Sequence, residues 1–579
     1  MIHSTKAAGT PACQSHFPRV SWSPRAAVAL ALLCLRLTTL LQSLAADAPA
    51  ASPPIRLNTV GYVPDCAKRA SIATTAICTN FNVVAAKDGR RVFSGKVTKP
   101  VLNEDTQEPL YQADFSSVTK PGTYYLEVDG VGRSPTFSIG RDVYVQPFTT
   151  LVRSMYLWRC GTAVRGSHGG DVFAHAACHT NDAWLDLATG EHKIQKANGG
   201  WHDAGDYNKY VVNAGITVGC MVRAWEDFQP NLAKLGYELP EAGGPLPEFL
   251  AEIKWEMDWL LTMQATNGAV HHKLSTTNFG PFILPEKETT ARYMTPWSSA
   301  ATADFVAMTA MAARHFKPYD APYATRCLEA AKGSRAFLKE HPEDVRADLS
   351  AFKTGTYATR DPDDRLWAAA EFWETTGDGE ALADFESRAR SLGPAVDQDF
   401  DWGNVKNLGL FTYLASKRPG RDAALVNEMQ GHLVRVADRI VAAAAAHGYA
   451  RPLGSRYYWG CNGSVARQAM VLHAAFKASP KAEYRETALD AMNFLLGRNS
   501  FARSFITGIG DHPPLHPHDR RSGGDSVEAP WPGYLVGGAN PRAVDWNDQQ
   551  ADFRTNEIAI NWNGALIYAM AACLDGARW

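Results

Sequence analysis

The spacing of the apolar residues changes once along this 579-residue chain, near residue 145. Before that point short runs of β-branched and aromatic residues alternate with turn pairs such as Asp88-Gly89, Pro121-Gly122 and Asp129-Gly130. Seven runs are expected to be strands: 55–63, 68–74, 81–86, 90–97, 111–118, 122–128 and 134–139. About seven short strands in about 85 residues predict a small β-sandwich domain over 54–142.

After residue 146 the apolar residues recur about every 3.6 positions, as on one face of a helix. Phe305, Met308 and Ala312 share such a face. Twelve helices are expected: 147–159, 208–228, 246–266, 302–314, 320–339, 365–376, 379–392, 406–417, 422–446, 464–478, 483–497 and 556–574. The period predicts an all-α domain over 146–577. Twelve helices joined as hairpins suggest the closed (α/α)6 barrel, with six inner and six outer helices.

The longest apolar run, 26–46, has the layout of a secretory signal. Lys6, Arg19 and Arg25 precede it, and small residues follow it. We therefore predict a signal peptide over 1–48 and a soluble product, secreted or periplasmic, with no membrane segment after its removal. The alternative is an uncleaved membrane anchor, but Arg36 leaves fewer than about 18 continuous apolar residues.

The charge balance and the aromatic content narrow the class of partner. The chain has 58 Lys and Arg against 60 Asp and Glu, so it lacks the basic excess of a nucleic-acid binder. It also has 16 Trp, 20 Tyr and 24 Phe. Indole rings beyond the needs of core packing indicate a surface that binds a partner.

Carboxylates cluster in two segments. The segment 199–210, GGWHDAGDYNKY, places Asp203 and Asp206 three residues apart, among glycines that permit tight turns and before a helix expected at Asn208. Two carboxylates so placed can point to one water, although a helix N-cap with a solvated neighbour is an equally ordinary explanation. The second segment, 546–570, carries Asp548, Asp552 and Glu557, the last at the start of an apolar helix.

Between these segments lies the Gly/Pro-rich loop 504–524, which holds several histidines and arginines. Loops longer than about 15 residues, such as 267–296 and 499–553, are expected to carry chemistry rather than only to connect helices. Two cysteines of the strand region, Cys66 and Cys78, are able to pair in an oxidising compartment.

Together these segments resemble glycoside hydrolase family 9, the inverting cellulases with an (α/α)6 barrel. The loop 504–524 is similar to the His-containing signature of the family, through Ser504, Ile506, Thr507, Gly510, Pro517, His518 and Arg520. It departs from that signature at His512. The segment 546–563 is similar to the acid-containing signature, through Trp546, Asp548, Phe553, Glu557, Ala559 and Asn563, and departs from it at Gly564. The preceding strands resemble the immunoglobulin-like module of one subgroup.

The resemblance implies roles for particular residues. Asp206 is then the catalytic base, Asp203 helps to hold the water, and Glu557 is the acid, with Asp548 in support. Burial is expected to raise the pKa of Glu557 so that it carries a proton. His518 and Arg520 look like substrate-orienting residues, with His272 as a further contact. Candidates for stacking on sugars, or alternatively for core packing, are Tyr207, Trp297, Trp367, Trp402, Trp459 and Trp562.

Two metal sites are expected. Cys160, Cys178, His179 and His202 are a donor set suited to tetrahedral zinc, and the same arrangement resembles zinc ligands of some family members. The alternative is a Cys160–Cys178 disulfide with two ordinary histidines. Asp363 and Asp364, with Asp401, resemble family calcium ligands, and a solvated acidic turn is the alternative.

The function predicted from these motifs is a monomeric endo-β-1,4-glucanase that hydrolyses a β-1,4-linked polysaccharide or oligosaccharide with inversion. The alternative within enzymes is an exo-acting relative, either a cellobiohydrolase or an exo-β-glucosaminidase. A non-catalytic glycan-binding protein is disfavoured because all three carboxylates are present.

Overall fold

The computed structural model describes residues 52–574 and Trp579. The predicted signal peptide over 1–48 lies outside these residues and stays a prediction. Among the helices of the described part, none combines the length and the hydropathy that a membrane span requires.

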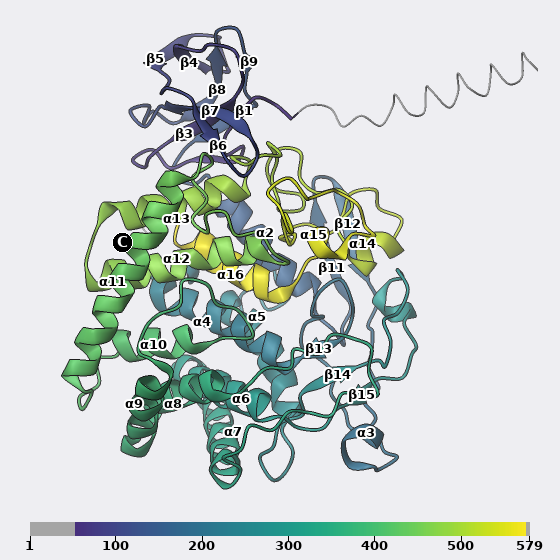
Figure 1. Cartoon of the computed structure of the whole chain (residues 1–579). Coiled ribbons are helices and arrows are strands. Elements are labelled where there is room, and N and C mark those ends of the chain that lie inside the picture. The colour runs from purple at the N-terminus through teal and green to yellow at the C-terminus, as the bar shows by residue number, and fades with distance from the viewer. Residues whose placement is uncertain (1–51, 575–578) are drawn as a thin grey trace, which may run out of the picture. The chain divides into compact units, whose positions relative to one another are not determined.

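The first domain consists of two facing sheets, drawn in purple and blue in Figure 1. One sheet has the order β1 (Ile55–Arg56), β3 (Arg69–Ala73), β7 (Glu108–Asp114), β6 (Val101–Asn103). The other has the order β2 (Gly61–Tyr62), β10 (Phe137–Ile139), β8 (Gly122–Val128), β4 (Asn80–Ala85), β5 (Arg91–Lys96), with β9 (Gly132–Arg133) beside β8. Their inward side chains form one apolar core, which includes Phe81 and Leu126. The predicted sandwich is therefore present.

The first predicted strand, 55–63, is divided between the two sheets. Asn58 Oδ1 accepts hydrogen bonds from the backbone N–H groups of Val60 and Gly61, at 3.0 and 3.2 Å, and so turns the chain between β1 and β2. A Cβ on Gly61 would lie 2.3 Å from the carbonyl oxygen of Ser138, so this crossing requires glycine. The short strands β6 and β9 were not predicted.

All twelve predicted helices are present in the second domain, with ends shifted by a few residues. They are α2 (Val145–Leu157), α4 (Val211–Leu232), α5 (Glu248–Thr262), α6 (Ser299–Phe316), α7 (Ala321–Glu340), α8 (Pro362–Thr376), α9 (Gly379–Leu392), α10 (Lys406–Ala415), α11 (Ala423–Ala446), α12 (Cys461–Ala478), α13 (Ala482–Leu495) and α16 (Ile560–Ala571). Short elements join them: α3 (Asp186–Thr189), a 3-10 turn (Pro285–Lys287), α14 (Arg520–Gly524) and α15 (Phe553–Asn556).

These helices are of two kinds. In α16 every residue is buried, and α6 and α12 are buried almost all round. By contrast α11 buries one stripe, Leu425, Met429, Leu433, Val436, Ala437, Ile440 and Ala444. A helix that is apolar on all sides belongs inside a layer of others, whereas an amphipathic one covers it. Accordingly α4 packs on α6, α6 on α8 and α8 on α10, while α16 packs on both α12 and α4.

Two small sheets lie between helices. One is the hairpin of β11 (Val164–His168) and β12 (Asp171–His175). The other has the order β13 (Lys209–Tyr210), β14 (Lys273–Ser275), β15 (Tyr293–Met294). Helix α4 was predicted to begin at Asn208, but the chain stays extended through Tyr210, because β13 pairs with β14.

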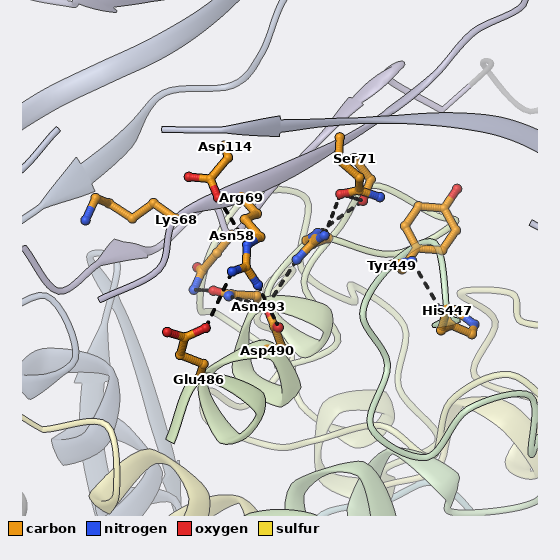
Figure 2. A network of polar contacts seen from close by, with 12 residues as sticks. Asn58, Lys68, Arg69, Ser71, Asp114, His447, Tyr449, Glu486, Asp490 and Asn493 are labelled. Atoms are coloured by element: carbon orange, nitrogen blue, oxygen red, sulfur yellow. Dashed lines mark hydrogen bonds and ion pairs between the residues drawn. The ribbon is translucent and has the colours of Figure 1, made fainter. Parts of the chain in front are cut away.

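Polar contacts join the strand domain to α13, as Figure 2 shows. Arg69 of β3 lies 3.3 Å from Asp114 and 3.4 and 3.9 Å from Glu486 and Asp490 of α13. Arg498, just after that helix, donates to Ser71 Oγ at 3.1 Å. The first residues of the long loop that follows α13 are therefore held by hydrogen bonds to the strand domain.

The two cysteines predicted to be able to pair are both buried and free. Cys78 lies in the core of the strand domain, whereas Cys66 packs against residues of the helical domain. Their separate surroundings explain why they do not form a disulfide.

Candidate active site

The turn that carries the first two carboxylates is built on α5. Glu252 and Glu256, one helical turn apart, both face it. Glu252 accepts from the indole N–H of Trp201 at 2.8 Å, and Glu256 accepts from its backbone N–H at 2.6 Å. A Cβ on Gly200 would lie 2.9 Å from the Cβ of Trp259, so the glycine lets the turn approach the helix.

Asp203 and Asp206 leave this turn with different partners. Asp203 is buried and accepts from Asn213 Nδ2 at 2.7 Å and from the hydroxyl of Tyr357 at 2.8 Å. Asp206 accepts from Asn208 Nδ2 at 2.5 Å, and the Tyr210 hydroxyl lies 3.4 Å from the same oxygen. Burial, together with the nearby charge of Asp206, raises the pKa of Asp203 well above its usual range.

Glu557 reaches the same place from the other end of the chain. It lies in extended backbone between α15 and α16, rather than at the start of a helix as predicted. Its neighbour Ala559 pairs with Ala204, which brings the carboxyl next to the turn. Burial, followed by the charges of Asp206 and Asp203, raises the pKa of Glu557 well above its usual range. A carboxyl so placed favours its protonated form.

Gly205 is the point where the turn contacts the loop 504–524, which carries His518. A Cβ there would lie 2.2 Å from the carbonyl oxygen of His518. The guanidinium of Arg520 donates to the Gly205 carbonyl at 2.8 Å and to the Gly280 carbonyl at 2.9 Å. Arg520, predicted to orient substrate, is therefore buried and ties together the two loops that border the cleft.

His518 is partly buried, and the backbone engages one of its ring nitrogens. Its Nδ1 donates to the Gln550 carbonyl at 2.7 Å, which assigns the proton of the neutral ring to Nδ1. Burial lowers its pKa, which favours that neutral form.

The three carboxyl groups border a cleft of about 350 Å³. Three predicted tryptophans line it: Trp402, Trp459 and Trp562. Trp459 is 49% exposed, and Trp562 is packed on Gly460 and Gly463, where a Cβ would collide with its ring. An exposed indole beside carboxyl groups is a surface on which a sugar ring can stack.

Four other predicted contacts lie elsewhere. His272 is buried, and its nitrogens bond to Ser298 Oγ at 2.8 Å and to the Thr356 carbonyl at 2.7 Å. Tyr207 is buried beside His202 and donates to the Ile283 carbonyl. Trp297 packs on Phe337 and His341, and Trp367 is fully buried in α8. None of these four side chains lines the cleft, because long-range packing rather than local sequence decides which ring is exposed.

Asp548, predicted to support the acid, acts through the backbone. It accepts from the N–H groups of Leu515 and His516 at 2.8 and 2.9 Å and from Asn556 Nδ2 at 3.2 Å. Asn556 directly precedes Glu557. The carboxylate therefore holds the segments on either side of the acid in place.

Several cleft residues, Tyr210 among them, were missed in the sequence. Tyr357 and Phe279 line the cleft, and so does Asn561, which donates to Asp401 at 2.8 Å. Tyr357 comes from the loop after α7, which carries no recognisable motif. Only its positive backbone φ of 43° marks it, and that is a property of the structure.

The four predicted zinc donors form one cluster. Their ligand atoms all lie within 4.8 Å of one another. Cys160 Sγ lies 3.6 Å from His179 Nδ1, and Cys178 Sγ lies 3.7 Å from His202 Nε2. A zinc tetrahedron with bonds of about 2.3 Å to sulfur and about 2.0 Å to nitrogen has sulfur–nitrogen edges of about 3.5 Å, so the donors fit. The two cysteines are free, so the alternative disulfide is not formed.

The three carboxylates predicted for calcium have three different partners. Asp401 pairs with Arg467, Asp363 accepts from the backbone N–H of Val405 at 2.7 Å, and Asp364 is fully buried beside Asp304. In the part of the chain that the structure describes, the zinc donors are the one group of at least three such side chains that converge. No calcium ligand set follows from these positions.

A largely helical domain whose cleft joins three carboxyls to indole rings, one of them exposed, defines a polysaccharide hydrolase. The profile of "Glycosyl hydrolase family 9" matches residues 144–570, and that of "Cellulase N-terminal ig-like domain" matches residues 50–133. The chain belongs to glycosyl hydrolase family 9 and carries an immunoglobulin-like domain before the helical one.

Individual relatives are also family 9 enzymes or endoglucanases. "Endoglucanase D" of Acetivibrio thermocellus is 55% identical over 524 residues, which cover 90% of this chain and 83% of the relative. A solved structure of a metagenome-derived family 9 endoglucanase matches with a TM-score of 0.85 and 33% identity, over 90% of this chain and 99% of the other. A zinc-binding triple mutant of a family 9 endoglucanase matches with a TM-score of 0.83 and 32% identity, over 89% and 100%.

Proposed function

We propose that this chain is an endo-β-1,4-glucanase that hydrolyses β-1,4-glucosidic bonds with inversion. The observation that carries the proposal is the cleft in which Asp203, Asp206 and Glu557 meet beside three tryptophans. The similarity to Endoglucanase D supports the substrate class. A neutral glucan suits a cleft whose recognition surface is aromatic rather than basic.

In the proposed mechanism Asp206 is the base. Its contacts with Asn208 and Tyr210 orient the carboxylate. Asp203, held by Tyr357 and Asn213, positions the attacking water for it. Inversion requires base and acid to stand about 6.5–9.5 Å apart, which leaves room for that water.

Glu557 is the proposed acid, because its raised pKa keeps a proton for the leaving oxygen. His518, whose Nδ1 is bonded to the Gln550 carbonyl, is proposed to orient a sugar hydroxyl through Nε2. Trp402, Trp459 and Trp562 are proposed to stack on the sugar rings.

The decisive experiment is product analysis on β-glucan and carboxymethylcellulose with detection of the anomer first formed. We expect the α-anomer and a rapid fall in viscosity. The β-anomer contradicts inversion, and a slow fall in viscosity favours an exo-acting enzyme.

Glu557→Gln and Asp206→Asn should each lose most turnover and still bind oligosaccharide. Asp65→Asn, at an exposed site of the strand domain, is the control.

We further propose that Cys160, Cys178, His179 and His202 bind a structural zinc ion. A closed site of four protein ligands contributes to folding rather than to the reaction. The site fixes the pairing of segment 158–160 with 200–202, in which the Cys160 N–H donates to the Gly200 carbonyl at 2.8 Å. We expect about one zinc ion per chain in the purified protein and its loss in Cys178→Ser. A metal-free protein of unchanged thermal stability would contradict the site.

The finer architecture is also a proposal. A closed (α/α)6 barrel over 146–577, after a sandwich over 54–142, is supported by the contacts that return from α16 to α4. Export of a monomer after cleavage near residue 48 rests on the sequence pattern of 26–46. Sedimentation of the mature protein tests the monomer.

A further inference from the structure

Lys273 carries a buried ammonium group that has no ion-pair partner in the part of the chain that the structure describes. It lies in β14 with 0% of its surface exposed. Its Nζ donates to Thr354 Oγ1 at 2.9 Å and to the Gly355 carbonyl at 2.8 Å. Among the described residues, no carboxylate oxygen lies within 4.0 Å of its Nζ, the distance expected for an ion pair. Burial of an ammonium is unfavourable unless other charges compensate, so its surroundings must supply them.

The compensating charges are those of the cleft. Lys273 pairs with Tyr210 across β13 and β14, and its Nζ lies 5.4 Å from the centre of the Tyr210 ring. The hydroxyl of that ring lies 3.4 Å from Asp206 Oδ2. Burial lowers the pKa of Lys273 to about 8, while the charges of Asp206 and Asp203 oppose that change. The side chain therefore stays charged throughout the acidic range.

Lys273 also fixes the loop that carries Tyr357. Its two hydrogen bonds hold Thr354 and Gly355, and the neighbouring His272 donates to the Thr356 carbonyl at 2.7 Å. The next residue, Tyr357, donates to Asp203 at 2.8 Å. The position of that hydroxyl thus depends on the strand β14 behind it.

We propose that Lys273 is a positioning residue for the reaction, which anchors the 354–357 segment and supplies the fixed positive charge behind Asp206. The proposal rests on the proposed role of Asp206 as base. Lys273 is a further group, besides the proposed acid and base, that keeps the base in position.

Several charged or ionisable groups face Asp206 from the surrounding elements. The groups that interact with its charge are Asp203 in the same turn, Tyr210 in β13, Lys273 in β14, His518 and Glu557 before α16. Beside them, Tyr357 interacts with Asp203, and Arg520 of α14 interacts with Glu557. Two of these are cations at neutral pH, and the guanidinium of Arg520 is engaged by the carbonyls of Gly205 and Gly280. Lys273 is then the cation placed to offset the paired acids.

The test is the pH dependence of kcat/KM for Lys273→Gln and Lys273→Met. Loss of the positive charge removes an attraction between Lys273 and the carboxylate of the proposed base, so we expect the acidic limb of the pH profile to move to higher pH. We expect a shift of about one pH unit and a fall in kcat of about tenfold at pH 5, with KM changed less than about threefold. Gln keeps a donor for the Gly355 carbonyl, so it decides the question if the Met variant does not fold. An unmoved acidic limb in either folded variant overturns the proposal.

A matched control separates electrostatics from packing. Lys68 is likewise fully buried, and its Nζ donates to the carbonyls of Pro64 and Cys66 at 2.6 and 2.7 Å, but it lies in the strand domain. Lys68→Met should leave the acidic limb of the pH profile unchanged, and an equal shift in that variant overturns the proposal.

Asp206→Asn tests the base itself. Full turnover of that variant refutes the proposed function, whereas an inactive Asp206→Asn beside an unmoved limb refutes the role of Lys273 alone.

Discussion

Tyr357 donates its hydroxyl to Oδ2 of Asp203 at 2.8 Å, from a backbone in the left-handed region with φ of 43°. A non-glycine residue held in that region costs about 1–3 kcal/mol, so the surrounding contacts must compensate. The other oxygen of Asp203 accepts from Asn213. The carboxyl is therefore held in one orientation by two donors from distant parts of the chain.

Tyr357→Phe removes this hydrogen bond and keeps the ring. We expect kcat to fall about tenfold while KM stays nearly constant, because a lost hydrogen bond to a buried carboxyl is worth about 1.5–3 kcal/mol. Steady-state kinetics on a soluble β-glucan measures both constants. Tyr111→Phe, which removes a hydroxyl bonded to the Ala76 carbonyl in the strand domain, should leave them unchanged. Equal kcat values for Tyr357→Phe and wild type would refute the role.

Gly205→Ala should displace the turn of the base. The added Cβ would meet the His518 carbonyl at 2.2 Å, and both partners are backbone, so no flexible side chain can yield. We expect kcat/KM to fall at least about a hundredfold, since misplacement by about 1 Å has that effect. Gly379→Ala in α9 is the control, because its Cβ would meet nothing within 4 Å. Near-normal activity of Gly205→Ala would show that the two loops separate freely.

The exposed and the packed tryptophans should differ in function. Trp459→Ala removes a cleft ring, and we expect KM for oligosaccharides to rise about tenfold, the equivalent of about 1.4 kcal/mol. Trp297→Ala removes a ring packed on Phe337, and we expect a lower melting temperature with nearly unchanged KM. Calorimetric titration with an inactive Glu557→Gln background measures binding directly. The reverse pattern would contradict the assignment.

Acid should weaken the contact between the domains. Asp105 lies in the turn after β6, and a hydrogen bond from His447 holds its pKa at about 2. Because this folded pKa lies below the unfolded one, the stabilisation is complete above about pH 4 and is lost as pH falls through about 2. Asp105→Asn should lower the free energy of unfolding by about 2 kcal/mol at pH 7, and less at pH 3.

Denaturant unfolding at pH 7 and pH 3 checks that prediction. Asp65→Asn, at an exposed carboxylate of the same domain, should leave the free energy of unfolding within about 0.5 kcal/mol of wild type. An equal loss for Asp105→Asn at both pH values would contradict the assigned pKa.

Glu288 should stabilise the proposed zinc complex. Its Oε2 lies 3.3 Å from Nε2 of His179, whose Nδ1 faces the donor cluster. Outer partners of ligating histidines typically change metal affinity about 10–100-fold, so Glu288→Ala should lose zinc to a chelator at a correspondingly lower concentration. Glu191→Ala, at an exposed carboxylate, is the comparison. Equal retention of zinc by both variants would contradict the role.

Much of the architecture could be predicted because helix and strand periods are local. The twelve helices follow from apolar residues spaced along single segments, and the errors fall at their ends. The helix start at Asn208 was wrong because the pairing of β13 with β14 depends on residues more than sixty positions away. Glu557 lies outside its predicted helix for the same kind of reason, since it pairs alongside His518.

Local patterns in the sequence were enough to identify the two kinds of domain, the family and the segments that carry the three carboxyls. What surrounds each carboxyl became visible only in the folded chain. It left Tyr207, His272 and Trp297 outside the lining of the cleft, and it brought Tyr357 and Lys273 near the aspartates although no sequence motif marks either for that role. The physical reason is that exposure, desolvation and hydrogen-bond partners arise between segments distant in the chain, whereas sequence patterns report only what neighbouring residues do.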